Sequence, residues 1–586
     1  MTKEERRELI KVAMGSKSAT LKIENANLVN VFSGEIYLAN IYIYKKYIVD
    51  AVEIEKDSYK PADKIIDIKN KYLVPGFIDS HLHIESSHLT PYHFAEAVIP
   101  KGTTTIVADP HEICNAIGEK GIEYMLEASE NLPMNQYYLV PSCVPSVVGL
   151  ENAGAEFDEK IIDKLLDKER ILGLGEVMDY IGVIQNSKRM EDIVDVAYQK
   201  KMFLQGHAPE IQGKELSAYL CGGPTTCHET RNGVHAIDKI RKGMVVDARE
   251  SSISKNIKTI VESIRDLKSP RNLTLCTDDR EPKDILDSGH VNNCVRVAID
   301  AGLDPIEAIR AVTLNPAQIY GLEKLGAIAP SYFADMLVID NLKDINVEKV
   351  FFNGELIAEN DRLLVKIDEP KIDLEILNTI KISELKLSDF KIKAPIEKGE
   401  IEIIGIQYTS KMSSVTKKKS FKVNVKNGYV DLEGSELNFA IAMNRYGKGT
   451  KHVTVVENFY INSGAVATTY SHDSHNLTII YKDPKDALVA GKKIEEIGGG
   501  IVLVDKGEVV KEIALPIAGM LSKKNAIELG KDLTEMNREL KKYGIEHINP
   551  IARTSTLSLI VIPEIKLSDV GIIDVVNQKV IDSIIK

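Results

Sequence analysis

The sequence lacks the features that would direct it to a membrane, to secretion or to a zinc knuckle. No apolar run approaches the roughly 20 residues of a membrane span, and the first residues, Met-Thr-Lys-Glu-Glu-Arg-Arg-Glu, are a charged start without a signal-peptide core. None of the six cysteines belongs to a C-x-x-C pair, and without a secretory signal the thiols are expected to be reduced. We therefore expect a cytoplasmic protein with no membrane partner.

The sequence is also short of positive charge and of aromatic side chains. Its 74 basic residues stand against 86 acidic ones, for a net charge of -12 and a pI near 5.7, and aromatics make up 6%. This balance argues against a nucleic-acid-binding surface and favours a small-molecule substrate. The chain of 586 residues exceeds what one hydrophobic core supports, so about two to four domains are expected. We also expect a homo-oligomer.

From residue 74 to about residue 320, apolar β-type runs alternate with helical stretches, which is the pattern of repeated β/α units. The predicted strands are Val74–Ile78, Thr103–Ala108, Gln136–Pro141, Ile171–Glu176, Met202–Gly206, Thr225–Cys227, Met244–Ala248 and Asn272–Thr277. Eight such units in about 250 residues have the size of a TIM barrel. The predicted fold class is therefore α/β with a TIM (β/α)8 barrel.

Short β-type segments lie on both sides of this region. Residues 1–73 and 326–365 alternate apolar and polar positions, and neither stretch is long enough for a core of its own. We predict that they combine into a composite β-sandwich domain flanking a metal-dependent catalytic barrel of residues 74–325. Residues 366–586 are predicted to form an additional C-terminal α/β domain, whose Ile-Gly-Gly-Gly run at 497–500 lacks the spacing of a phosphate-binding loop.

The histidines are unevenly distributed. Residues 1–80 contain none, whereas nine of the 13 lie between His81 and His290. His81 and His83 stand at the end of the first predicted strand, and side chains repeat every two residues on a strand, so both imidazoles point to the same side. Such a pair suits a divalent cation, and it equally fits two polar residues on an exposed strand face.

Other titratable residues follow strands at the same end of the predicted barrel. They are Asp109 and His111 after the second strand, Glu176 after the fourth, His207 after the fifth, His228 after the sixth, and Asp278 with Asp279 after the eighth. Each alone fits a helix cap or a solvated turn, but a TIM barrel gathers its catalytic residues at these strand ends. Four histidines and two carboxylates can hold two divalent ions. We predict Glu176 as the bridging ligand and Asp278 as a ligand that also carries the proton of a shared water.

Longer motifs surround these residues. They include Pro-Gly-Phe-Ile-Asp-Ser-His-Leu-His at 75–83, Ala-Asp-Pro-His-Glu-Ile at 108–113, Gly-His-Ala-Pro at 206–209, Cys-Thr-Asp-Asp-Arg at 276–280, Thr-Leu-Asn-Pro-Ala at 313–317 and His-Asp-Ser-His-Asn at 472–476. In these motifs, from about residue 22 to the C-terminus, the chain resembles the adenine deaminases of the metal-dependent amidohydrolase superfamily.

The resemblance implies a TIM barrel with a composite β-domain and an extra C-terminal domain. It also implies hydrolysis of adenine to hypoxanthine and ammonia by a metal-bound hydroxide at a binuclear centre, and a role in purine salvage and adenine catabolism. The two ions are expected to be manganese or iron, with zinc as an alternative. Carried over position by position, the ligands are His81, His83, Glu176, His207, His228 and Asp278. Glu176 takes the place that a carboxylated lysine fills in other branches.

Further residues are predicted to contact the substrate. We hypothesise that Asp109, His111, Glu112 and Asp279 face the purine and contact its ring nitrogens. For each of them, support of the metal ligands from behind is the alternative interpretation.

The C-terminal region contains one further cluster of titratable residues. His472, Asp473 and His475 lie outside the barrel region, and either a structural role or a role as a lid over the active site is open for them.

Cys227 and one segment of the C-terminal region depart from the family pattern. Cys227 precedes the strand-six histidine, where an acidic residue is usual, and the segment Val453–Ala465 lacks several expected glycines. These departures concern substrate fit and efficiency more than metal binding.

Three other functions compete with this one. A cyclic-amide hydrolase of the dihydroorotase or hydantoinase type commonly carries a carboxylated lysine after strand four, where this chain has Glu176. A non-catalytic scaffold homologue would not need to keep all the ligand positions. Single-zinc base deaminases use H-x-E with P-C-x-x-C. His83-Ile-Glu85 supplies the first half, but no P-C-x-x-C occurs, so Glu85 is interpreted as a loop residue.

Overall fold

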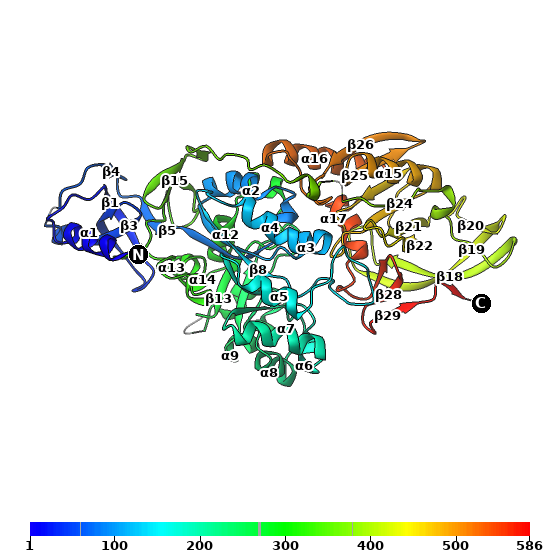
Figure 1. The fold of residues 1–586 in the computed structure, drawn as a ribbon, viewed down its shortest axis with the longest axis horizontal. Helices are drawn as coiled ribbons and strands as arrows, with labels where there is room; N and C mark the ends of the chain where they lie inside the picture. Colours follow the sequence, from blue (N-terminus) through cyan, green and yellow to red (C-terminus); the bar gives the residue numbers. More distant parts are fainter. Residues whose placement is uncertain (59, 268–270, 378, 586) are drawn as a thin grey trace.

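The computed structural model describes residues 1–58, 60–267, 271–377 and 379–585. Three regions follow one another across Figure 1: a sheet with the helix α1 (Lys3–Ala13) at the N-terminal end, parallel strands wrapped in helices in the middle, and a C-terminal region at the other end. Within the described residues, we find no helix with the length and apolar character needed to cross a membrane.

Parallel strands build the middle region. Five pair in the order β10-β9-β8-β7-β6 and three in the order β11-β12-β13. Their bounds are β6 Phe77–Leu82, β7 Thr103–Ala108, β8 Asn135–Val140, β9 Ile171–Val177, β10 Phe203–Gly206, β11 Thr226–Cys227, β12 Val245–Arg249 and β13 Leu273–Cys276. The two sheets adjoin at both edges, where the Asp278 N–H donates to the His81 carbonyl oxygen (3.0 Å) and the Thr225 N–H to that of Leu204 (3.2 Å). The arrangement is a TIM-barrel-like α/β fold.

Helices cover the outside of these strands because each has an apolar face. In α7 (Lys188–Gln199), Met190, Ile193 and Ala197 are buried, a spacing of three and four residues that places them on one side of the helix. The remaining helices of this region are α2 Pro91–Val98, α3 His111–Ile117, α4 Glu119–Ala128, α5 Glu159–Leu166, α6 Tyr180–Ile184, α8 Gly213–Cys221, α9 Gly233–Arg241, α10 Ile257–Ile264, α11 Pro282–Ser288, α12 Val291–Asp300, α13 Pro305–Arg310 and α14 Leu314–Ile319. Because helices cover the outside of the strands, functional side chains are expected at the strand ends.

The predicted strand Val74–Ile78 is in fact two strands in two different sheets. β5 (Tyr72–Pro75) pairs antiparallel with β14 (Met336–Ile339), whereas β6 starts at Phe77 and pairs with β7. Gly76 separates them, and a Cβ at this position would lie 2.2 Å from the Thr104 hydroxyl oxygen, so only glycine fits. The first barrel strand therefore starts three residues later than predicted and includes His81.

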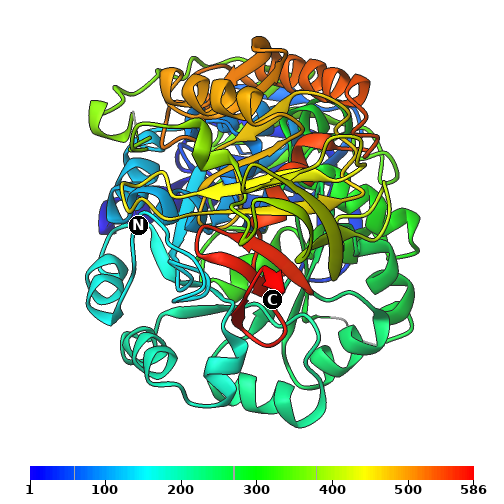
Figure 2. The same ribbon diagram turned by 90° about the vertical axis from the view of Figure 1, so that its right-hand side faces the viewer.

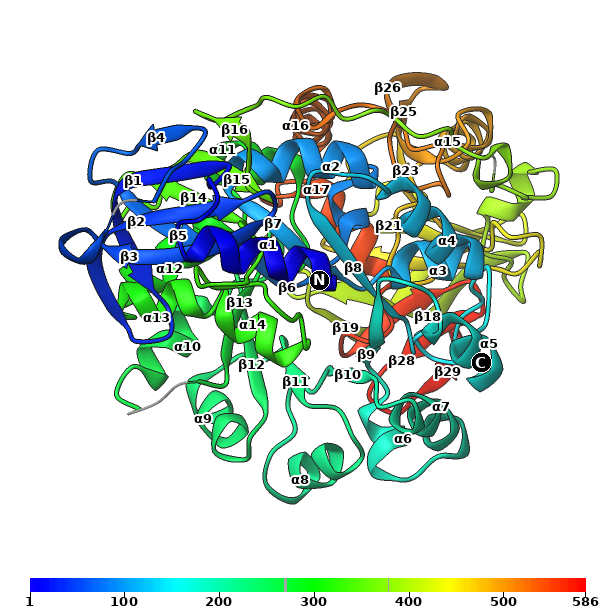
Figure 3. The same ribbon diagram turned by 60° about the vertical axis from the view of Figure 1, so that its left-hand side comes forward.

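Strands from both flanks of the barrel share one sheet (Figure 3). Its order is β17-β16-β15-β14-β5-β1-β2-β3, with β4 beside β1. The bounds not yet given are β1 Leu21–Asn30, β2 Glu35–Tyr44, β3 Tyr47–Glu53, β4 Ile65–Asp67, β15 Val347–Phe352, β16 Glu355–Glu359 and β17 Arg362–Leu363. Ile23, Ile41 and Met336 are among the fully buried side chains of its core. The predicted domain boundaries stay a prediction.

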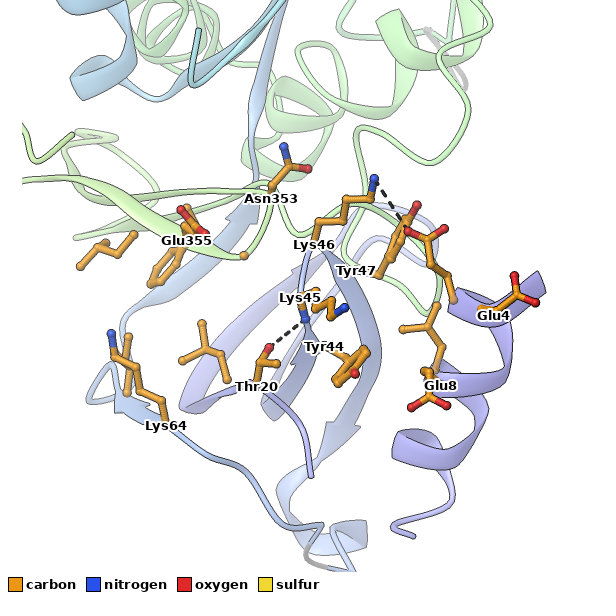
Figure 4. Close-up of a pocket in the computed structure, with 17 residues that line it drawn as sticks. Glu4, Glu8, Thr20, Tyr44, Lys45, Lys46, Tyr47, Lys64, Asn353 and Glu355 are labelled. Atoms are coloured by element: carbon orange, nitrogen blue, oxygen red, sulfur yellow. Dashed lines mark hydrogen bonds and ion pairs between the residues drawn. The ribbon is translucent and has the colours of Figure 1, made fainter. Parts of the chain in front are cut away.

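An open cavity of about 920 Å³ lies between α1 and this sheet (Figure 4). Its walls carry both signs of charge, with Lys46 4.0 Å from Glu5, and the Lys45 N–H donates to the Thr20 hydroxyl (2.8 Å). Its lining contains none of the predicted metal ligands.

The C-terminal region, which faces the viewer in Figure 2, is built on a large sheet. The sheet order is β20-β19-β18-β22-β21-β24-β23-β25-β26, with β30 beside β18, and a second sheet has the order β27-β28-β29. The strands are β18 Lys398–Tyr408, β19 Thr416–Lys426, β20 Tyr429–Asp431, β21 Asn438–Met443, β22 Lys451–Glu457, β23 Ala465–Thr468, β24 Leu477–Tyr481, β25 Gly500–Asp505, β26 Glu508–Ala514, β27 Ile565–Ser568, β28 Gly571–Asp574, β29 Lys579–Ile581 and β30 Ile584–Ile585. The helices are α15 Pro484–Glu496, α16 Ala526–Lys542 and α17 Pro550–Ser555.

Hydrogen bonds join the C-terminal region to the barrel. The Ser522 N–H donates to the His88 carbonyl oxygen (2.8 Å), and the Tyr470 hydroxyl donates to the Ser86 hydroxyl oxygen (3.0 Å). Because Ser86 belongs to the short 3-10 turn Ile84–Ser87, which comes soon after β6, the contact lies near the end of the first barrel strand. The C-terminal region therefore packs on the part of the barrel that holds the predicted site.

Candidate active site

The strand ends bring the six predicted metal ligands to one place. His81 lies on β6, His83 directly after it, and Glu176 on β9. The other three follow strands β10, β11 and β13; they are His207, His228 and Asp278. All except His207 are almost fully buried.

The Glu176 carboxylate lies among the four histidines. Its Oε1 atom is 3.2 Å from His83 Nε2 and 3.5 Å from His81 Nε2. Its Oε2 atom is 2.7 Å from His207 Nδ1 and 3.3 Å from His228 Nε2. Each carboxylate oxygen thus faces its own pair of imidazoles, which is the arrangement needed for one carboxylate to bridge two cations.

The hydrogen bonds of the histidines fit metal ions. His83 Nδ1 is 2.8 Å from the Asp109 carbonyl oxygen. Since a carbonyl only accepts, Nδ1 carries the hydrogen and Nε2 keeps a free lone pair directed at the carboxylates. Both ring nitrogens of His81 and Nδ1 of His228 are buried without a hydrogen-bond partner among the described residues. Unpaired buried nitrogens are costly, so this donor set suits divalent cations.

Asp278 is directed into this cluster by its backbone. Its φ of 55° lies in the left-handed region, which aspartate adopts more readily than most residues. The Oδ1 atom lies 3.4 Å from His81 Nε2 and 3.3 Å from His83 Nε2. Burial raises the pKa of Asp278, but the neighbouring Arg249 guanidinium opposes burial, and the pKa is held well below its usual range.

Arg249 is a site residue that the sequence analysis missed. Its guanidinium forms an ion pair with Asp278 Oδ2 and lies 2.7 Å from Glu229 Oε1. Arg249 is the last residue of β12, one position beyond the predicted strand Met244–Ala248. Its place at a strand end, as for the other site residues, is the signal that could have identified it.

Asp109 supports Glu176 from behind. Its Oδ2 atom accepts the Glu176 backbone N–H (2.7 Å). A Cβ on Gly175 would lie 2.4 Å from the same oxygen, so a glycine before Glu176 makes room for this bond. Among the described residues, Asp109 does not line the cavity described next. Its contact with a purine stays a prediction, while its hydrogen bond fixes Glu176.

A cavity of about 380 Å³ lies against the ligand cluster. His111, Glu112 and Asp279, three of the predicted substrate contacts, line it together with five of the six predicted ligands. The C-terminal region contributes His472, Asp473 and apolar side chains between residues 556 and 563. The cavity is thus shared between the barrel and the C-terminal region.

Glu112 lines the cavity, but both of its carboxylate oxygens already have partners. His472 Nδ1 is 2.6 Å from Oε1, and His475 Nε2 contacts Oε2. The spacing of these three residues would suit a metal ion. However, His475 Nδ1 accepts the Ser471 backbone N–H (3.2 Å), so its Nε2 carries the hydrogen and donates to Glu112. We interpret the cluster as hydrogen-bonded.

Two residues that the sequence analysis discussed lie outside the cavity lining. The Cys227 thiol is fully buried and accepts a hydrogen bond from Lys239 Nζ (3.2 Å). Glu85, interpreted as a loop residue, is a fully buried part of a short 3-10 turn, and its Oε1 atom accepts the Ile113 N–H (3.1 Å). Both side chains hold neighbouring loops of the barrel together.

Histidine and carboxylate side chains at the strand ends of a TIM-barrel-like fold define an amidohydrolase, and residues 72–357 match the Amidohydrolase family. Residues 413–579 match the Adenine deaminase C-terminal domain. Three proteins named adenine deaminase align over nearly the whole chain. They come from Kosmotoga olearia (37% identity, 97% of each chain), Thermosipho africanus (37%, 98% of each) and Clostridium acetobutylicum (38%, 98% of this chain and 99% of the relative). The chain belongs to the adenine deaminase family.

Solved structures align more weakly. An adenosine deaminase from Xanthomonas campestris with bound zinc has a TM-score of 0.44 and 14% identity, covering 60% of this chain and 95% of that one. The family assignment rests on the full-length relatives.

Proposed function

We propose that this chain is a cytoplasmic adenine deaminase that hydrolyses adenine to hypoxanthine and ammonia in purine salvage. The observation that carries the proposal is the Glu176 carboxylate, placed between two pairs of histidines beside a cavity of about 380 Å³. A cavity near the lower end of the roughly 300–1,000 Å³ typical of small-molecule sites suits a single flat base. The finer architecture, a closed (β/α)8 barrel with a composite β-domain and a C-terminal domain, is part of this proposal.

Two divalent ions would be held by the predicted ligand set, His81, His83, Glu176, His207, His228 and Asp278. When bound, such ions lower the pKa of water and so supply a nucleophile near neutral pH. Imidazole and carboxylate ligands suit manganese, iron and zinc, and we expect manganese or iron.

The protein's own residues orient the ligands and move protons. Asp109 fixes Glu176 through its backbone N–H, and Arg249 holds Asp278 Oδ2, which leaves Oδ1 facing His81 and His83. Asp278 takes the proton of the attacking water and delivers it to the departing amino group.

The cavity walls complete the site. His111 and Asp279 line the cavity and are proposed to contact the purine ring. Apolar surface is added to the cavity wall by Leu559, Val561, Ile562 and Pro563. We propose that they displace water from around a bound base, which would strengthen electrostatic interactions there.

The test is a spectrophotometric assay of adenine loss with measurement of released ammonia. The protein is loaded separately with manganese, iron and zinc, and equimolar loss of adenine and release of ammonia are expected with at least one metal. Inactivity on adenine under every loading, together with turnover of a dihydropyrimidine, would overturn the proposal in favour of a cyclic-amide hydrolase.

Asp278→Asn separates the chemical role of this residue from its role as a ligand. The amide keeps one oxygen for a metal but cannot carry a proton between water and the leaving group. We expect kcat to fall by about 10²–10⁴-fold, the usual contribution of general acid–base catalysis, with most of the metal retained. Full activity of the variant would refute the role of Asp278.

A further inference from the structure

One short segment of the C-terminal region, Tyr470–Asn476, reaches the cavity of the barrel. Tyr470 is hydrogen-bonded to Ser86 after β6, and His475 donates to Glu112 at the start of α3. His472 and His475 therefore each contact a different oxygen of the Glu112 carboxylate. These two contacts hold the segment from His472 to His475 in place.

The hydrogen-bond roles of His472 follow from its partner. An ionised carboxylate only accepts, so the His472 Nδ1 atom, 2.6 Å from Glu112 Oε1, carries a hydrogen. The other ring nitrogen, Nε2, is buried without a partner among the described residues, on a side chain that is 5% exposed and lines the cavity. Burial lowers the pKa of His472, but Glu112 outweighs burial and raises the pKa to about 9. At neutral pH, Nε2 is then a hydrogen-bond donor.

The next residue, Asp473, offers the complementary group. It is 3% exposed and lines the same cavity, and its Oδ2 atom is buried with no hydrogen-bond partner within the described part of the chain. Its Oδ1 atom lies 4.0 Å from His111 Nε2, so Asp473 is placed beside the barrel wall of the cavity. Two adjacent residues that line the cavity therefore carry one unused donor and one unused acceptor.

A free purine base has a matching edge. In adenine, the amino group on C6 and its neighbours N1 and N7 form the edges next to the reacting carbon, which must face the metal ligands. The edge that remains for the other walls consists of N3, an acceptor, and N9–H, a donor. A nucleoside has no N9–H, because the sugar is attached there.

We propose that His472 and Asp473 recognise the N3–N9 edge of a free purine base, with His472 Nε2–H donating to N3 and Asp473 accepting the N9–H. This rests on the proposed function for the reaction at C6 and adds the selection of free bases over nucleosides. Glu112 and His475 act as positioning residues, since they hold His472 without reaching the substrate.

The test compares three compounds that differ by one hydrogen-bonding atom. Adenine has both groups, 3-deazaadenine lacks the N3 acceptor, and 9-methyladenine lacks the N9–H donor. Dissociation constants are measured by calorimetry on metal-loaded protein that carries Asp278→Asn, which slows the turnover of adenine while the metal is retained. This protein, with residues 452, 472 and 473 unchanged, is the wild-type reference for the added substitutions His472→Ala and Asp473→Ala. His452→Ala is the matched control, because Nε2 of this histidine of the C-terminal region is also buried with no hydrogen-bond partner among the described residues. His452 is not part of the cavity lining described above.

We expect the wild type to bind each analogue about 10–100-fold more weakly than adenine, the effect of a hydrogen bond that involves a charged group. His472→Ala removes the difference between adenine and 3-deazaadenine only, and Asp473→Ala removes the difference between adenine and 9-methyladenine only. Asp473→Asn keeps an acceptor oxygen and restores part of the preference for adenine, while His452→Ala behaves as wild type.

The inference is overturned if the variants weaken binding of all three compounds by the same factor, or if they change none of them. Since binding is measured directly, the result does not depend on turnover. Discrimination among the compounds by the wild-type reference, with no release of ammonia from adenine by the unmutated chain, would refute the proposed function alone.

Discussion

Replacing Arg249 by methionine tests the electrostatic account of the site. The guanidinium is the cationic partner of the buried carboxylate of Asp278 and of the partly buried carboxylate of Glu229, and only 7% of Arg249 is exposed. Methionine preserves most of the volume of the side chain but removes the guanidinium from Asp278, and it leaves Glu229 with Arg231, at 3.9 Å. Breaking a buried ion pair in this way costs about 3–5 kcal/mol, most of which is the penalty of an uncompensated buried charge.

A double-mutant cycle tests whether the loss of stability in Arg249→Met comes from the uncompensated buried charge. Asp278→Asn removes the buried charge that Arg249→Met leaves without its guanidinium partner. If the unpaired charge is the cause, the double variant loses less stability than the sum of the single variants, with a coupling energy of at least about 1 kcal/mol. Arg249→Lys is the control: it keeps the charge but cannot span both carboxylates, so an intermediate loss is expected.

The assay is the denaturant midpoint of metal-free protein, measured where refolding is complete. Metal-free protein is used because a cation at Asp278 would itself compensate the charge. Unchanged stability of Arg249→Met, or strictly additive losses in the cycle, would refute the reasoning.

Two further predictions concern metal content and pH. Glu176→Gln removes the charge that both histidine pairs face, so the variant should retain fewer than two ions per chain by elemental analysis, and full retention would contradict the bridging role. Burial lowers the pKa of Lys566, whose Nζ atom donates to the Thr556 carbonyl oxygen (3.0 Å), to about 7. Between pH 7 and 10 the unfolded lysine binds a proton that the folded one does not, so stability should rise with pH by up to about 1.4 kcal/mol per unit. Lys566→Met lacks this slope and should exceed wild type in melting temperature most clearly at pH 7; a difference independent of pH would contradict the assignment.

Much of the fold and site follows from local sequence patterns. Thr103–Ala108 is predicted and observed with identical bounds, because a mainly β-branched run lies there between turn residues, Gly102 before it and Asp109-Pro110 after it. Parallel strands joined by helical crossovers all end on one face of the barrel. The approach of His207 and His228 to Glu176 could therefore be predicted from the sequence alone.

The features that could not be predicted depend on contacts between residues far apart in the sequence, or on the exact residue at which a strand ends. The run Val74–Ile78 is apolar throughout, and periodicity cannot show that the chain changes sheets at Gly76. Arg249 was missed because the predicted strand ended one residue early. The contact between Glu112 and His475 joins residues 363 positions apart, and no local pattern encodes it.

The sheet shared by the two flanks has a consequence for synthesis of the chain. β5 is an edge strand until its neighbour β14 exists, and the whole barrel is made between them. At the usual elongation rate of roughly 5–20 residues per second, this edge waits on the order of 10–50 s for its partner. During that time an open edge can pair with other chains. The nascent protein is therefore expected to need a chaperone or early barrel folding to protect its first strands, long before the active site exists.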